Sequence, residues 1–106
     1  MAAALAALER RSVERWSGEH VQRIAARVRP GHAVRVVNLS SRGALVETRC
    51  SLRPGARVHV HFRPAGNDAV DVIAQVGRCH VAAIHQGTLF RAALIFDREV
   101  VALRPG

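Results

Sequence analysis

Residues 33–48 read AVRVVNLSSRGALVET, and this stretch decides the fold. Apolar residues dominate Ala33 to Leu39 and again Ala44 to Thr48, whereas the segment Ser40 to Gly43 between them is polar and ends in glycine. Two short runs of this kind, separated by a turn, are typical of neighbouring strands in an antiparallel sheet. We therefore predict a strand on each side of this turn.

The same pattern continues along most of the chain. Pro30-Gly31, Pro54-Gly55 and Gln86-Gly87 mark further turns, as does the loop at residues 64–68. Further strands are predicted at Val21–Arg29, Arg57–Phe62, Val70–Ile84 and Leu89–Phe96. About six strands with closely spaced turns predict an all-β domain, either a small antiparallel barrel or a sandwich.

The two ends of the chain read differently from its middle. The alanine-rich segment 2–16 predicts a helix that Ser17-Gly18 ends, and residues 97–106 predict a loose helical turn or a disordered tail. A chain of 106 residues is long enough for one domain with a modest core. We expect a leader at residues 1–18, a barrel at 19–98 and a C-terminal tail at 99–106.

The charge of the chain points to an anionic partner. The formal net charge is +8, and all 16 basic residues are arginine. The planar fork of arginine binds phosphate and guanine through two hydrogen bonds and stacks on flat rings. Composition alone leaves a nucleotide, a nucleic acid and an acidic protein face all open as partners.

Targeting and cysteine usage indicate a cytoplasmic protein. The apolar start, Met1 to Leu8, lacks the leading positive charge of a secretory signal, and no apolar run is long enough to cross a bilayer. We therefore expect no membrane insertion. Cys50 and Cys79 have no metal-ligand or disulfide-framework spacing, so we interpret them as small buried hydrophobes in a reducing compartment.

The sequence offers no constellation typical of an enzyme or a metal centre. His59 and His61 share a strand face but lack a third ligand at a suitable spacing, and the side chains of Cys79 and His80 point to opposite faces. There is no nucleophile elbow, phosphate loop or paired carboxylates. We expect a protein that is not an enzyme, with no metal and no bound cofactor.

Two short motifs remain, and each has an ordinary structural interpretation. Arg11 and Arg15 lie four positions apart and could form a solvated basic helix face. In Asn38-x-Ser40-x-x-Gly43 the polar side chains can satisfy a tight corner, where glycine supplies positive φ or a close approach. Together, paired arginines and a small polar turn suggest a pocket for an anionic molecule that carries guanine.

The combination of these motifs resembles the PilZ domain, the bacterial receptor module for cyclic di-GMP. The similarity covers Arg-x-x-x-Arg, then Asn-x-Ser-x-x-Gly followed by Ala-Leu-Val-Glu. It continues in the proline-glycine segment Leu52–Val58, in Ala74–Arg78 and in the closing strand Leu89–Phe96. The resemblance spans about residues 10–98. It implies a six-stranded antiparallel β-barrel of PilZ type, with an N-terminal helical or flexible leader.

The resemblance also implies a role for each motif residue. Arg11 and Arg15 contact the phosphates and the Hoogsteen edge of guanine, whose O6 and N7 acceptors suit a guanidinium fork. Asn38 bonds the base edge, Ser40 a phosphate or base, and Gly43 permits close backbone approach to the ligand. An extra basic residue before the pair, here Arg10, implies two stacked ligand molecules.

Two points stay open in this interpretation. Arg23 and Arg27 have the same spacing as the first pair and would share a face on a strand, so they could be the clamp instead. We prefer Arg11 and Arg15 because their separation from Asn38 leaves room for a whole strand. Trp16 either pins the leader onto the barrel, which we prefer, or stacks beside the ligand.

We therefore expect an adaptor that binds cyclic di-GMP, changes its surface on binding, and signals to an effector protein that the sequence does not identify. One alternative is a PilZ-like barrel that binds no nucleotide and serves as a protein-interaction module. A second alternative is a basic β-barrel that binds single-stranded nucleic acid. We rank this last because Trp16 and three phenylalanines are too few to form a stacking platform.

Overall fold

A computed structural model describes residues 15–29, 31–66 and 68–104 of the chain. It contains one short helix, α2 (Glu19–Gln22), and seven strands. The strands are β1 (Arg15–Ser17), β2 (Ala25–Val28), β3 (His32–Ser40), β4 (Gly43–Thr48), β5 (Arg57–Arg63), β6 (Val70–Ile84) and β7 (Thr88–Phe96).

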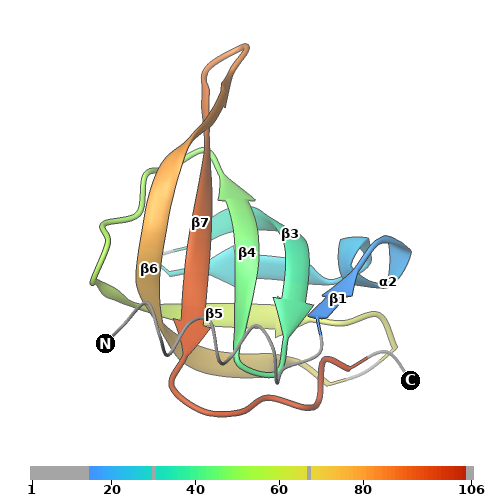
Figure 1. Cartoon of the computed structure of the whole chain (residues 1–106). Helices are drawn as coiled ribbons and strands as arrows, with labels where there is room; N and C mark the ends of the chain where they lie inside the picture. Colours follow the sequence, from blue (N-terminus) through green and yellow to red (C-terminus); the bar gives the residue numbers. More distant parts are fainter. Residues whose placement is uncertain (1–14, 30, 67, 105–106) are drawn as a thin grey trace.

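Six of these strands form a closed antiparallel barrel. The order β3-β2-β5-β6-β7-β4 is completed by pairing between β3 and β4, which joins the two ends of the sheet (Figure 1). The extra strand, β1, pairs with residues 38–40 of β3, whereas β2 pairs with residues 32–35. Every pairing between the six barrel strands is antiparallel. The six-stranded all-β barrel expected from the sequence is therefore confirmed.

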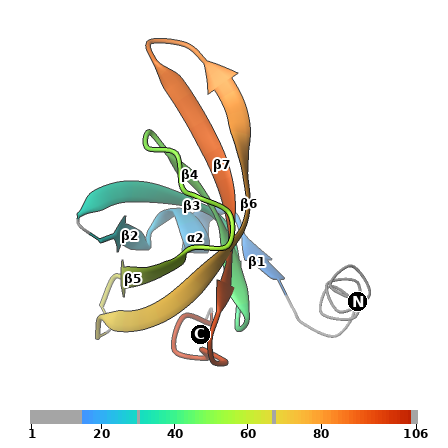
Figure 2. The same ribbon diagram turned by 90° about the vertical axis from the view of Figure 1, so that its left-hand side faces the viewer.

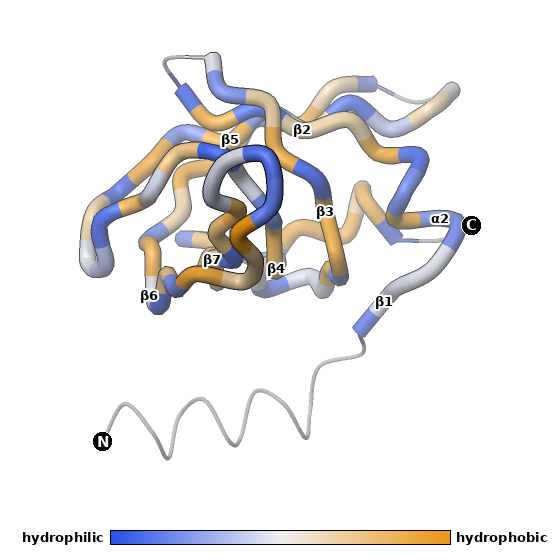
Figure 3. The backbone as a smooth tube through the Cα atoms, turned by 90° about the horizontal axis from the view of Figure 1, so that it is seen from above, coloured by the Kyte–Doolittle hydropathy of each residue, from blue (hydrophilic) through white to orange (hydrophobic). Residues whose placement is uncertain are grey.

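Alternation along the strands sends apolar side chains inward. On β5, Val60 and Phe62 are buried, whereas Arg57, His59 and Arg63 are exposed. Hydrophobic and hydrophilic positions accordingly alternate along the barrel strands in Figure 3. Inside, the rings of Phe62 and Phe96 meet edge to face, with their centroids 5.7 Å apart.

The first strand differs from the sequence prediction at its start. The run from Val21 was predicted to be a strand, but residues 19–22 form α2 and the strand begins only at Ala25. The predicted helix 2–16 is wrong at its last two residues, because Arg15 and Trp16 belong to β1, and its residues 2–14 lie outside the described part. Pairing of Trp16 with Leu39 outweighs local helix propensity here.

Two residues of the segment after β7 belong to the core. Val100 and Leu103 are each 1% exposed, and Val100 N donates to Ser41 O at 2.7 Å. His20 Nε2 lies 3.0 Å from Leu103 O. The described residues 97–104 thus close the barrel beside the β3–β4 turn (Figure 2), instead of forming the disordered tail that we allowed for. The apolar run from Val100 to Leu103 is too short to carry a periodic signal from which this packing could be predicted.

Candidate nucleotide-binding corner

The β3–β4 turn is held by the side chain of Ser40. Its hydroxyl oxygen accepts hydrogen bonds from Arg42 N at 3.1 Å and from Gly43 N at 3.2 Å. Ser40 is only 3% exposed. The hydroxyl and both backbone N–H groups are therefore engaged within the turn. The geometry favours a positioning role for Ser40 over the direct ligand contact that the resemblance implied.

Gly43 lies where β4 approaches β7 most closely. It pairs with Ile95, and a Cβ placed on Gly43 would lie 2.4 Å from the backbone oxygen of Leu94. A real side-chain carbon does not tolerate that distance. Of the two roles that we considered for this glycine, the structure supports close approach, and the partner is a neighbouring strand of the barrel.

Arg15 reaches the same corner from β1. The register places Arg15 opposite Ser40 and Ser17 opposite Asn38. From there Arg15 Nη1 donates to Asn38 Oδ1 at 3.0 Å, at an exposed position. Because a guanidinium can only donate, the amide oxygen of Asn38 faces it, and no described residue accepts a hydrogen bond from the amide N–H2. The corner thus combines a cationic fork with amide donors, a set that suits phosphate oxygens or the O6 and N7 of guanine.

Trp16 fixes β1, and with it Arg15. The indole is 5% exposed and belongs to the hydrophobic core, where it lies across from Leu39. Its Nε1–H has no hydrogen-bond acceptor among the described residues. The burial agrees with our preferred interpretation, in which Trp16 pins the leader onto the barrel.

Two of the expected binding residues, Arg10 and Arg11, lie outside the described residues. One cation that sequence reasoning did not select is Arg42, which is exposed in the turn itself between Ser41 and Gly43. Its place in the motif was visible in the sequence, but only the closed turn shows that the side chain lies at the corner's surface. The described corner therefore brings together Arg15, Asn38, Ser40 and Gly43.

The second arginine pair is not arranged as a clamp. Arg23 follows α2 and forms an exposed ion pair with Glu19, so it does not share a strand face with Arg27. Arg27 lies opposite Ala33 on β3, five positions from Asn38, a separation of about 17 Å along the strand. The expectation that Arg23 and Arg27 share one strand face is therefore wrong, because helical residues interrupt that strand.

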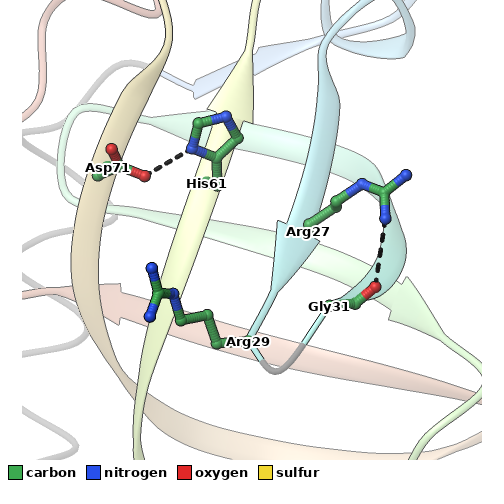
Figure 4. A pocket seen from close by; sticks show the side chains of 5 residues that line it. All are labelled: Arg27, Arg29, Gly31, His61 and Asp71. Carbon is green, nitrogen blue, oxygen red and sulfur yellow. Dashed lines mark hydrogen bonds and ion pairs between the residues drawn. The ribbon is translucent and has the colours of Figure 1, made fainter.

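Arg27 instead lines a separate cationic groove on the outside of β2, β5 and β6 (Figure 4). The other lining residues are Arg29, Gly31, His61 and Asp71. Arg27 Nη1 donates to Gly31 O at 3.4 Å, and His61 Nδ1 lies 2.6 Å from Asp71 Oδ1. The groove is open, and it lies at the other end of β3 from the corner.

A buried carboxylate joins three strands on another part of the barrel. Glu47 is 7% exposed and pairs with Arg35 on β3 and with Arg91 on β7, in direct register with both. Arg35 Nε donates at 2.9 Å and Arg91 Nη2 at 2.5 Å. These bonds, first from Arg91 and then from Arg35, lower the pKa of Glu47 below its ordinary value of 4.5. Sequence reasoning missed this triad because only barrel closure aligns the three residues.

Other kinds of site receive no support from the described part of the chain. Within residues 15–29, 31–66 and 68–104, no three His, Cys, Asp or Glu side chains gather as metal ligands. No helix within these ranges has the length and apolar character needed to span a bilayer.

Comparison with known proteins agrees with this architecture. The family model for the PilZ domain matches residues 9–98, most of the chain. The matched range contains both the arginine motif and the Asn38–Gly43 motif. Neither the comparison with curated proteins nor the comparison with solved structures found a match.

Proposed function

The chain belongs to the PilZ domain family, whose members in general are binding and adaptor modules, and on this premise we propose that it is a cytoplasmic receptor for cyclic di-GMP. The ligand binds, without being altered, at the corner formed by β1 and the β3–β4 turn. The single observation that carries this proposal is the contact of Arg15 with Asn38, which unites the two separate motifs on one exposed surface.

Each residue of the corner has a chemical role in this proposal. Arg15 offers its fork to a phosphate or to the O6 and N7 of guanine, and the free amide N–H2 of Asn38 donates to the same ligand. Arg11, four residues before Arg15, supplies the second fork. Ser40 and Gly43 act as positioning residues, because one closes the turn and the other lets β4 pack against β7.

We base the signalling step on the order of the sequence, in which Arg11 and Arg15 come before the barrel strands. A ligand that bridges Arg11, Arg15 and the turn holds the leader against β3. The ordered leader then presents a different surface to an effector protein. The protein thus acts as an adaptor, and the barrel supplies the fixed half of the site.

Calorimetric titration of cyclic di-GMP tests this proposal. Arg15→Ala is expected to weaken binding by about tenfold to one hundredfold, because a charge-assisted contact is lost. Arg27→Ala is the matched control, since it removes another exposed strand arginine about 17 Å away along β3, and it should leave the affinity unchanged. Fluorescence of Trp16, the single tryptophan, checks that the indole is still buried in each variant.

The same titration separates the alternatives. No binding by the wild type would refute the receptor and favour an interaction module without nucleotide. Loss of binding in Arg27→Ala but not in Arg15→Ala would move the site to the groove. Tight binding of oligonucleotides that grows with their length would favour the nucleic-acid barrel.

Arg10 is proposed to admit a second stacked ligand molecule. In that case the wild type takes up two molecules per chain and Arg10→Ala takes up one. A stoichiometry of one in the wild type would contradict this part of the proposal without touching the corner itself.

A further inference from the structure

The β6–β7 hairpin extends well past the rest of the barrel. β5 pairs with β6 only as far as Gln75, and β4 pairs with β7 only from Phe90 onward. Beyond these points β6 and β7 pair with each other alone, as far as Ile84 and Thr88. Figures 1 and 2 show this part projecting as an arm. We call residues 77–90 the arm.

One face of the arm continues the apolar lining of the barrel. The pairs Cys79–Ala92, Val81–Phe90 and Ile84–Thr88 lie on the side of the two strands that faces inward in the barrel. A bulge at Ala82 brings Ile84 onto the same side as Val81. The core still covers this stripe at Ala92, which is buried, and at Cys79, which is partly buried, but the cover ends farther along the arm. Val81 is therefore 51% exposed and Ile84 is 79% exposed.

The opposite face of the arm carries one formal positive charge, on Arg78. Arg78 and His80 point outward on β6, and His80 lies across from Arg91. The sequence contains no Asp or Glu between Asp71 and Asp97, so nothing on the arm itself neutralises Arg78. Arg91 differs, because Glu47 already pairs with it.

The arm also has a free backbone edge. The loop before β5 bonds β6 for the last time at Val76, where Val76 N donates to Ala56 O at 2.8 Å and Val76 O accepts from Gly55 N at 2.7 Å. From Gly77 to Ile84 no described strand pairs with this edge. Unpaired backbone donors and acceptors in an extended strand are a template for one more strand.

We propose that the free edge of the arm binds an extended, acidic segment of a partner protein as an additional antiparallel strand. In this segment apolar and acidic residues alternate. The apolar residues continue the stripe beside Val81, and the acidic residues lie beside Arg78 and His80 on the other face. A second copy of this chain fits less well, because its arm brings the same positive charge and no acid.

The docking site lies at the other end of β7 from the nucleotide-binding corner. Ile95 pairs with Gly43 at the corner, whereas Thr88 and Leu89 belong to the arm. The assignment of this partner to signalling rests on the proposed adaptor function. The docking step itself requires no cyclic di-GMP and is testable in its absence.

The probe is a soluble peptide of about nine residues in which valine and glutamate alternate. Fluorescence anisotropy measures its affinity for the full chain, and hydrogen exchange measures protection of residues 77–84. Ile84→Ser and Arg78→Glu are each expected to weaken binding by about tenfold. Val101→Ser is the matched control for Ile84→Ser, since Val101 is 56% exposed but lies off the arm. It should leave the affinity unchanged.

Controls on the peptide separate strand addition from simple charge attraction. A version with lysine in place of glutamate should not bind, and a version with serine in place of valine should bind at least about tenfold more weakly. Every variant is also titrated with cyclic di-GMP. An arm variant that loses the peptide but keeps the nucleotide affinity of the wild type supports the docking site. If the wild type binds no nucleotide, the corner proposal fails and the peptide titration still tests the docking site by itself.

Three results would overturn the proposal. The first is no binding of the alternating peptide, or binding without protection of residues 77–84. The second is self-association of the wild type, by sedimentation, that Ile84→Ser abolishes, which would make a second copy the occupant. The third is binding to vesicles with anionic headgroups that depends on Ile84 and exceeds binding of the peptide.

Discussion

Replacement of Gly43 by alanine tests whether this glycine serves the barrel. The added Cβ would lie 2.4 Å from Leu94 O, whereas ordinary van der Waals contacts begin at 3.4 Å. The two strands must therefore separate by about 1 Å. Both groups belong to the backbone, in a strand pair that is continuous from Gly43 to Thr48, so no side chain can rotate to make room.

The size of the effect follows from this geometry. Overpacking in a core costs about 1 to 3 kcal/mol, and a clash between backbones belongs at the upper end of that range. The gain from restricting the unfolded chain offsets less than about 1 kcal/mol. We expect the free energy of unfolding to fall by about 2 to 3 kcal/mol, and the melting temperature by about 10 °C.

Gly77→Ala is the matched control. A Cβ at Gly77 would meet Ile95 Cδ1 at 3.2 Å, and that atom is the flexible tip of a side chain that is 46% exposed. Because the tip can move away, we expect a change within about 0.5 kcal/mol. Urea unfolding followed by tryptophan fluorescence measures both variants. Equal stability of the two variants would refute the close approach of β4 to β7 as the reason for Gly43.

Three further predictions concern other residues. Glu47→Gln should reduce the loss of folding stability that the wild type shows as pH falls. The pKa of Glu47 is lowered in the folded protein, so its ionised carboxylate stabilises the wild type above about pH 4.5. This contribution is lost as pH falls through the lowered pKa. Urea midpoints measured from pH 7 to pH 3 check this, and parallel profiles for the two proteins would contradict it. Ser40→Ala should lower the free energy of unfolding by about 1 to 2 kcal/mol, because two backbone N–H groups lose their acceptor. Ser41→Ala, measured in the same urea titration, should have little effect. Equal losses in the two variants would contradict the role of the Ser40 hydroxyl. Trp16→Ala should destabilise the domain by about 3 kcal/mol, as measured by thermal unfolding. The same change should weaken the binding of cyclic di-GMP, as measured by calorimetry. Unchanged nucleotide affinity would show that β1 docks without the indole.

Much of the barrel was predictable from local patterns. Alternation in Arg57–Phe62 and the glycine turn after Ser40 are local signals, and the predicted strands there agree with β5 and β4. The start of the chain was less predictable. Alanine-rich sequence favours a helix up to Trp16, but burial of the indole against Leu39 makes residues 15–17 a strand.

The candidate site was likewise predictable only in part. Its turn residues were visible as a motif, and so was the spacing of the arginines. The spacing led us to prefer Arg11 and Arg15 over Arg23 and Arg27, but the sequence does not show which arginine lies beside Asn38 until the strand register is known. Pairing of β1 with residues 38–40 places Arg15 at the corner, and pairing of β2 with residues 32–35 places Arg27 at the far end.

The sequence by itself thus determined most of the barrel strands, the turn and the basic character of the protein, because alternation, glycine and charge act over a few neighbouring residues. Only the tertiary structure decided which distant residues meet. Closure of the sheet aligns Arg35, Glu47 and Arg91 and brings the backbone of β7 against Gly43. It also leaves the end of the long hairpin without a covering layer, because β4 is shorter than its neighbour β7 and β5 is shorter than its neighbour β6.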